Sequence, residues 1–199
     1  YMLALFLLFP FHSAAQEVPE PEVKTPFPVK SLSWNSDDTL FSLGEENVVF
    51  VRDAQTSRVV HTVNFHDALS LMFASEGGAG RSSMLGLSAD GTMNVWNLGD
   101  TVQTERGAVT EVEPSYTVAS EDSKRIISAA FSNSSDSIAA GMDDGPVYIY
   151  FKLRYTHQLV SRRLEGHRKP AYSLQFSPDN TLLVSASEDG TLIIWDAVT

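Results

Sequence analysis

The sequence predicts an all-β fold made of four repeated units, and three observations lead to this prediction. When the chain is aligned with itself, the same order of short apolar segments and turns occurs four times. The dipeptide Asp-Gly recurs at 90–91, 144–145 and 189–190, each time flanked by β-branched or aromatic residues. A helix-rich fold finds almost no support. We therefore expect short antiparallel strands joined by tight turns.

The fourth unit shows the pattern most clearly. Its strands are expected at Ala171–Phe176, Thr181–Ser187 and Thr191–Asp196. Pro178 suits a type I turn between the first two strands, because its fixed φ matches that turn. Asp189-Gly190 suits the two-residue hairpin turn between the second and third strands, which needs positive φ angles. Each unit is therefore predicted to be a meander of short strands.

The other units repeat this order less faithfully. The third runs from Ile126 to Phe151, the second ends in Leu85–Asn97, and the first, Val29–Asp53, has Glu46-Asn47 in place of Asp-Gly. Matching third-strand positions are Arg52, Trp96, Tyr150 and Trp195, separated by 44, 54 and 45 residues. This period is typical of the four-stranded blades of a β-propeller.

The predicted blades span residues 29–65, 66–119, 120–164 and 165–199, after an apolar segment and a proline-rich linker at 1–28. Outer strands are expected at 58–63, 115–119 and 157–164, and the last blade is expected to lack one. A seven-bladed ring would need roughly 300 residues, which indicates part of a longer protein or a propeller completed by a partner. In the alternative, a closed four-bladed ring takes its missing strand from Pro21–Lys30, whose prolines disfavour a strand.

Composition and charge narrow the function classes. The net charge of -11 disfavours direct nucleic-acid binding, because it repels phosphate. The absence of cysteine excludes disulfides and thiolate metal sites and fits a cytoplasmic or nuclear protein. The histidines lack metal-ligand spacing and no phosphate loop is present, so no metal or cofactor is expected.

The first sixteen residues carry no charged side chain, but their apolar run is short for a membrane-spanning helix. They could instead be a signal peptide with Ser13–Ala15 as the cleavage site, although a basic start is missing. No membrane contact is expected unless this segment is a signal or an anchor. A secreted or lumenal binding propeller is therefore the alternative to a cytoplasmic or nuclear one.

The repeat resembles the WD40 family. The residues that carry the resemblance are Gly166-His167, Ser177–Asp179, Ser185–Thr191 and Trp195-Asp196, within a similarity that extends over Val29–Asp196. It implies a β-propeller, usually of seven blades, that serves as a rigid, non-catalytic platform for other proteins. Leu164–Gly190 is also similar to the WD-repeat subunit of the superkiller and polymerase-associated factor complexes. That similarity implies a multisubunit complex acting in RNA decay and transcription elongation.

The resemblance also implies a buried hydrogen-bonded tetrad, which maps onto His167, Ser185, Asp189 and Trp195. A closed chain of donors and acceptors satisfies polar groups that are costly to bury singly. The same residue types could form a charge-relay triad, so a hydrolase using Ser185 and His167 is the competing hypothesis. It would need Ser185 exposed in a cleft beside an oxyanion hole. A serine inside a central strand is poorly placed for attack, and we favour the structural role.

The second and third units keep only part of this tetrad. The second has Asp90 and Trp96, with His66 near the histidine position and Gly86 in place of the hydroxyl residue. The third has Asp144 and Tyr150 but Ala140 at the hydroxyl position. These blades are expected to depend more on apolar packing.

The resemblance also implies partner-binding residues at the start of the first strand and just before the turn aspartate, on the face opposite the two insertions. They are Arg168, Lys169, Tyr172, Glu188 and Asp143, and the alternative is an ordinary solvated rim. Two insertions, Ala74–Ser83 and Gly99–Pro114, are expected as flexible loops, with a partner contact as the alternative.

Overall fold

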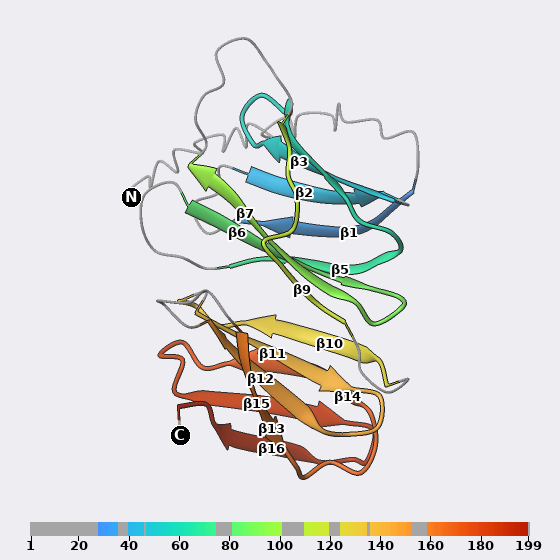
Figure 1. Cartoon of the computed structure of the whole chain (residues 1–199), viewed down its shortest axis with the longest axis vertical. Helices are drawn as coiled ribbons and strands as arrows, with labels where there is room; N and C mark the ends of the chain where they lie inside the picture. The colour runs from blue at the N-terminus through green and yellow to red at the C-terminus, as the bar shows by residue number, and fades with distance from the viewer. Residues whose placement is uncertain are drawn as a thin grey trace, which may run out of the picture.

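In a computed structural model, the described residues of the chain form sixteen β-strands in four sheets. The structure describes residues 28–35, 40–45, 47–74, 81–100, 110–119, 124–134, 136–152 and 159–198, and no helix lies within these ranges. The sheets follow one another in chain order from one end of the molecule to the other (Figure 1). The predicted all-β fold class is confirmed.

Each sheet is one blade, numbered in chain order. Blade 1 contains β1 (Val29–Trp34), β2 (Leu40–Glu45), β3 (Val48–Asp53) and β4 (Val59–Asn64). Blade 2 contains β5 (Ala68–Phe73), β6 (Arg81–Ser88), β7 (Met93–Asp100) and β9 (Tyr116–Val118). Blade 3 contains β10 (Ile126–Phe131), β11 (Ser137–Met142), β12 (Val147–Lys152) and β13 (Leu159–Leu164). Blade 4 contains β14 (Ala171–Phe176), β15 (Leu182–Ser187) and β16 (Leu192–Asp196).

The outer strands β4, β9 and β13 overlap the three segments predicted for them. In its described residues, blade 4 has three strands. The alternative of a closed four-bladed ring placed Val29 and Lys30 in the missing outer strand of the last blade. This placement is wrong, because both residues begin β1, which pairs with β2. Blades 1 and 4 lie at opposite ends of the molecule (Figure 1). The predicted signal segment and most of the linker, residues 1–27, lie outside the described residues.

A β-bulge recurs at the same place in the first strand of every blade. It falls between Val29 and Ser31, Ala68 and Ser70, Ile126 and Ser128, and Ala171 and Ser173. A bulge changes which side chains face which side of a sheet, so a shared bulge gives all four blades the same alternation. Residues at matching register can therefore be compared directly between blades.

Among the described residues, the core consists of three apolar clusters, one between each pair of successive blades. Each cluster contains two neighbouring side chains from a third strand: Val49 and Val51, Met93 and Val95, or Val147 and Ile149. All six are at most 4% exposed. The next blade covers each pair, because residues of its first and second strands belong to the same cluster. Each blade is thus stabilised mainly by its neighbours.

Part of the second insertion pairs with blade 1. Its β8 (Thr110–Glu111) runs parallel to β4, and the amide of Val112 donates to the carbonyl of Thr62 at 3.0 Å. The insertions are also shorter than expected, because Gly99 extends β7 and Arg81–Ser83 begins β6. The remaining parts, residues 75–80 and 101–109, lie outside the described residues.

The three Asp-Gly turns have a positive φ at the glycine, as predicted, but not at the aspartate. They are therefore three-residue loops and not the predicted two-residue turns: the Gly190 amide donates to the Ser187 carbonyl, and the Ser187 amide donates to the Thr191 carbonyl. Their surroundings differ. Gly91, Gly145 and Gly190 have φ angles of 86°, 116° and 81°. A β-carbon on Gly145 would lie 2.6 Å from the carbonyl oxygen of His167, in the segment that leads into blade 4. A β-carbon on Gly190 would meet no atom of the described chain within 4 Å. The turn of blade 3 therefore packs against blade 4.

We expect Gly145→Ala to lower the free energy of unfolding more than Gly190→Ala does. Both substitutions place a β-carbon at positive φ, which costs about 1–2 kcal/mol. Only the first also forces the turn away from the His167 carbonyl. Urea denaturation of both variants measures the difference. Equal losses would show that the turn of blade 3 does not depend on blade 4.

Candidate functional site

Blade 4 brings its four predicted tetrad residues together. His167 lies between β13 and β14, Ser185 in β15, Asp189 in the following turn and Trp195 in β16. His167 Nε2 lies 2.7 Å from Ser185 Oγ, and Trp195 Nε1 donates to the same oxygen at 2.8 Å. His167 Nδ1 lies 3.3 Å from Asp189 Oδ2. The histidine side chain and Ser185 are almost completely buried.

The hydrogen-bond roles in this network are mutually consistent. Because the oxygen of Ser185 accepts from the Trp195 indole, its own proton can point to His167 Nε2. Nδ1 then carries the ring proton and faces Asp189. Sequence reasoning missed a fifth member, Thr191, whose hydroxyl donates to Asp189 Oδ1 at 2.6 Å. Its position two residues after the aspartate, typical of an Asx turn, was the available signal.

Asp189 is the electrostatic centre of the network. The hydroxyl of Thr191 and then the backbone amide of Arg168 hold the pKa of its carboxyl well below the ordinary value of 3.8. The Arg168 amide donates to Oδ2 at 2.9 Å, and the Thr191 amide donates to Oδ1 at 2.9 Å. The carboxylate thus ties the segment before β14 to the β15–β16 turn.

The network contains the residue types of a catalytic triad, but its serine is not accessible to a substrate. Ser185 is 1% exposed, so a substrate carbonyl cannot approach its oxygen. That oxygen also accepts the indole proton of Trp195. A nucleophile needs a reacting atom within about 3 Å and nearby oxyanion donors. The geometry is that of satisfied buried polar groups.

Blade 2 fills the same place with apolar side chains. Phe65 takes the place of the histidine, and its ring meets Trp96 edge-on with centroids 5.0 Å apart. In blade 4, His167 and Trp195 are also edge-on, at 6.1 Å. A β-carbon on Gly86 would lie 2.7 Å from the Phe65 ring, which explains why this position has no hydroxyl side chain.

His66, the predicted counterpart of His167, is exposed in blade 2. The indole nitrogen of Trp96 is buried and has no hydrogen-bond partner among the described residues. The sequence signal for Phe65 was weak, because Phe65 and His66 are adjacent and both side chains are aromatic. In blade 3, Ala140 is fully buried, and Asp144 pairs with Lys124 at 2.7 Å.

Three of the predicted partner-binding side chains form one exposed group next to the tetrad. Tyr172 is 59% exposed, and its hydroxyl donates to Glu188 Oε2 at 3.2 Å. Lys169 Nζ lies 3.4 Å from the other oxygen of Glu188. The hydrogen bond to Glu188 raises the pKa of Tyr172, so its hydroxyl stays a donor at neutral pH. We call Lys169, Tyr172 and Glu188 the rim cluster.

The other two predicted partner residues are placed differently. The side chain of Arg168 is exposed, while its backbone amide donates to the carboxylate of Asp189 in the tetrad. Asp143 lies in the matching turn of blade 3, and its carboxylate is 3.7 Å from Arg125 Nε. The structure thus brings three of the five predicted residues into direct contact.

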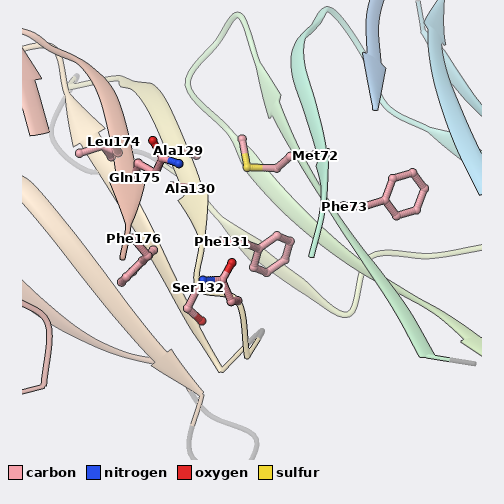
Figure 2. A pocket seen from close by; sticks show the side chains of 10 residues that line it. Met72, Phe73, Ala129, Ala130, Phe131, Ser132, Leu174, Gln175 and Phe176 are labelled. Atoms are coloured by element: carbon pink, nitrogen blue, oxygen red, sulfur yellow. The ribbon is translucent and has the colours of Figure 1, made fainter. Parts of the chain in front are cut away.

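A cavity of about 300 Å³ lies along the inner strands of three blades. Its walls come from β5, from β10 and the residues after it, and from β14 (Figure 2). The lining residues are Met72, Phe73, Ala129, Ala130, Phe131, Ser132, Asn133, Leu174, Gln175 and Phe176. None of these described lining residues has a side chain that titrates near neutral pH.

In the described part of the chain, no group of three or more histidine, aspartate or glutamate side chains is placed to hold a metal ion. In the same residues, no helix is long and apolar enough to cross a membrane.

Comparisons with known proteins agree with this architecture. Residues 158–196 match the family described as "WD domain, G-beta repeat". Human Striatin-4 is 30% identical over 125 residues, which are 58% of this chain and 16% of that protein. The mouse serine-threonine kinase receptor-associated protein is 26% identical over 170 residues, covering 85% of this chain and 43% of the relative. The SIR4-interacting protein SIF2 of Saccharomyces cerevisiae is 25% identical over 177 residues, covering 86% and 32%.

The fold is similar to that of a solved structure. Sqt1 of Saccharomyces cerevisiae superimposes with a TM-score of 0.67 and 16% identity, covering 86% of this chain and 46% of that one. The family match supports a WD40 repeat within residues 158–196, and the structural similarity shows the fold of part of a β-propeller. The chain spans less than half the length of each of these proteins.

We expect Ser185→Ala to lower the free energy of unfolding by about 1–3 kcal/mol, because it leaves buried donors and acceptors of His167 and Trp195 unsatisfied. Ser173→Ala is the matched control, since Ser173 is exposed on the neighbouring strand, and it should change stability by less than about 0.5 kcal/mol. Thermal unfolding followed by circular dichroism measures both. A Ser185→Ala protein as stable as the wild type would contradict the structural role.

Stability should also fall in acid. Asp189 has a lower pKa in the folded state than in the unfolded chain, so its contribution is present above about pH 3.8 and is lost as the pH falls below that value. The pKa values of Asp90 and Asp179 are lowered too, by the Thr92 amide and the Ser177 hydroxyl. Urea midpoints between about pH 5 and about pH 3 should fall less steeply for Asp189→Asn than for the wild type. Equal slopes would contradict the assignment.

Proposed function

We propose that the chain is a non-catalytic scaffold for protein–protein interactions and that the rim cluster contacts a partner. The observation that carries this proposal is the exposed Tyr172, which Glu188 holds in place directly beside the buried tetrad. Tyrosine is enriched among residues that dominate binding energy, because it adds contact area at a low entropic cost. The neighbouring Lys169 and Glu188 add charges of both signs, which favour a partner with a complementary pattern.

Two relatives support an interaction role through their names. One is described as receptor-associated and another as SIR4-interacting. The narrower hypothesis is a WD-repeat subunit of the superkiller and polymerase-associated factor complexes, acting in RNA decay and transcription elongation. It rests on Leu164–Gly190 and stays a prediction. A cytoplasmic or nuclear location and the absence of direct nucleic-acid contact belong to the same proposal.

We expect the double variant Lys169→Glu, Tyr172→Ala to lose at least one partner that the wild type retains. Recovery of that partner should drop at least tenfold, corresponding to a binding loss of about 1.4 kcal/mol or more. Affinity purification of tagged proteins with quantitative mass spectrometry measures recovery. Lys152→Glu is the control, because it makes the same charge change at the far end of the third strand of blade 3.

The double variant should melt at the wild-type temperature, because Lys169 and Tyr172 are mostly exposed. Equal melting with unchanged recovery of every partner would overturn the proposed role of the rim cluster.

A further inference from the structure

The chain covers the outer edge of blade 1 with residues from its own second insertion. In β8, Glu111 lies opposite Thr62 of β4, the Val112 amide donates to the Thr62 carbonyl at 3.0 Å, and Asn64 donates to Glu111. We call Thr110–Val112 the strap. The strap pairs with β4 over two residues, whereas β1 to β4 pair with one another over five or six. It is therefore the element of blade 1 that is least costly to detach.

His61 of β4 lies on the face of blade 1 that packs against blade 2. It is directly opposite Val51 in the β3–β4 ladder, and directly opposite residues share a face. Val51 is fully buried in the cluster shared by the two blades. Val112 of the strap packs against the same cluster. Detaching the strap therefore removes an apolar side chain from the face on which His61 lies.

One nitrogen of the His61 ring is buried without a partner. Nδ1 has no hydrogen-bond partner among the described residues and no contact with solvent. Burial lowers the pKa of His61, because it disfavours the charged ring. A protonated ring donates from both nitrogens, so Nδ1 would then need an acceptor or water. The proton is best accommodated when this side of the ring becomes accessible.

The described side chains around His61 offer no opposite charge. Those of β5, β6 and β7 in blade 2 include no titratable group, and His61 is the only one in β4. Arg52 of β3 and Glu111 of β8 each stand next to a residue that faces blade 2, so alternation places them on the other face. Arg52 accordingly lies over the Phe50 ring, 5.8 Å from its centroid. A charged His61 would thus be uncompensated beneath the closed strap.

We propose that acid detaches the strap from β4, because protonation of His61 favours the open state. A solvated histidine gains its proton at about pH 6.5, whereas burial lowers the pKa of His61 in the closed state. The open state therefore binds the proton more readily. The strap should stay closed above about pH 6.5 and detach progressively below it. In the open state the Thr62 carbonyl loses its partner, and the edge of β4 becomes free.

Thiol labelling measures strap opening directly, because the chain has no cysteine of its own. Val112→Cys reports opening, and Thr117→Cys, exposed on β9, corrects for the effect of pH on thiol reactivity. The ratio of their labelling rates with N-ethylmaleimide should rise about threefold to tenfold between about pH 7.5 and about pH 5.5, since one proton is taken up. Ala140→Cys, at a fully buried position of blade 3, should stay unlabelled while the blades remain folded.

Variants of His61 identify the group that responds. In His61→Leu and His61→Gln proteins, which cannot be protonated there, the ratio should stay constant over this range. His66→Gln is the matched control, because His66 is exposed just after β4 and its loss should leave the response unchanged. Circular dichroism checks that each variant is folded. A ratio that does not change with pH when His61 is present, an equal rise in both His61 variants, or labelling of Ala140→Cys together with Val112→Cys would overturn the proposal.

Discussion

The packing of one blade on the next is the constraint on which this structure depends. A single blade is a thin sheet with apolar side chains on both faces, so it cannot bury them alone. Burying a valine, leucine or isoleucine side chain contributes about 1.5–3 kcal/mol. A typical hydrogen bond contributes about 1 kcal/mol net. Pairs such as Val147 and Ile149 therefore account for more of the stability than polar networks do.

Blades 2 and 4 show that the polar network is one of two solutions to the same packing problem. In blade 4, His167, Ser185 and Trp195 satisfy each other's polar atoms. In blade 2, Phe65 and Gly86 occupy the matching space, and the Trp96 indole remains fully buried. An aromatic ring set edge-on against the tryptophan is common to both blades. Shape is thus retained where hydrogen bonding is not.

The sequence predicted the features that depend on local chemistry. The Asp-Gly turns could be recognised, because positive φ angles restrict the choice of residue to a few types. The tetrad residues of blade 4 could be recognised from their spacing along one repeat. By contrast, the pairing of β8 with β4 joins Thr110 to His61, which lie far apart in the sequence. A two-residue strand has no periodicity to reveal it, and its partner is set by tertiary structure.

The sequence pattern indicated His66, and not Phe65, for the histidine position of blade 2, and the physical reason is different. A repeat pattern aligns residue types, and His66 has the expected type at nearly the expected position. The buried site selects for fit, however, and because Gly86 supplies no hydroxyl in blade 2, a histidine there would have an unsatisfied nitrogen. The neighbouring phenylalanine carries no such cost. Alternating exposure along the chain, which sequence alone does not show, decided between the two side chains.

The buried tetrad and the exposed rim cluster are parts of one arrangement. Asp189 accepts hydrogen bonds from the amides of Arg168 and Thr191, so it fixes two segments of backbone at once. Lys169 directly follows Arg168, and Glu188 directly precedes Asp189. Glu188 in turn orients the Tyr172 hydroxyl. The residues that resemble a catalytic triad thus have a positioning role, because they hold rigid the backbone from which the rim cluster projects.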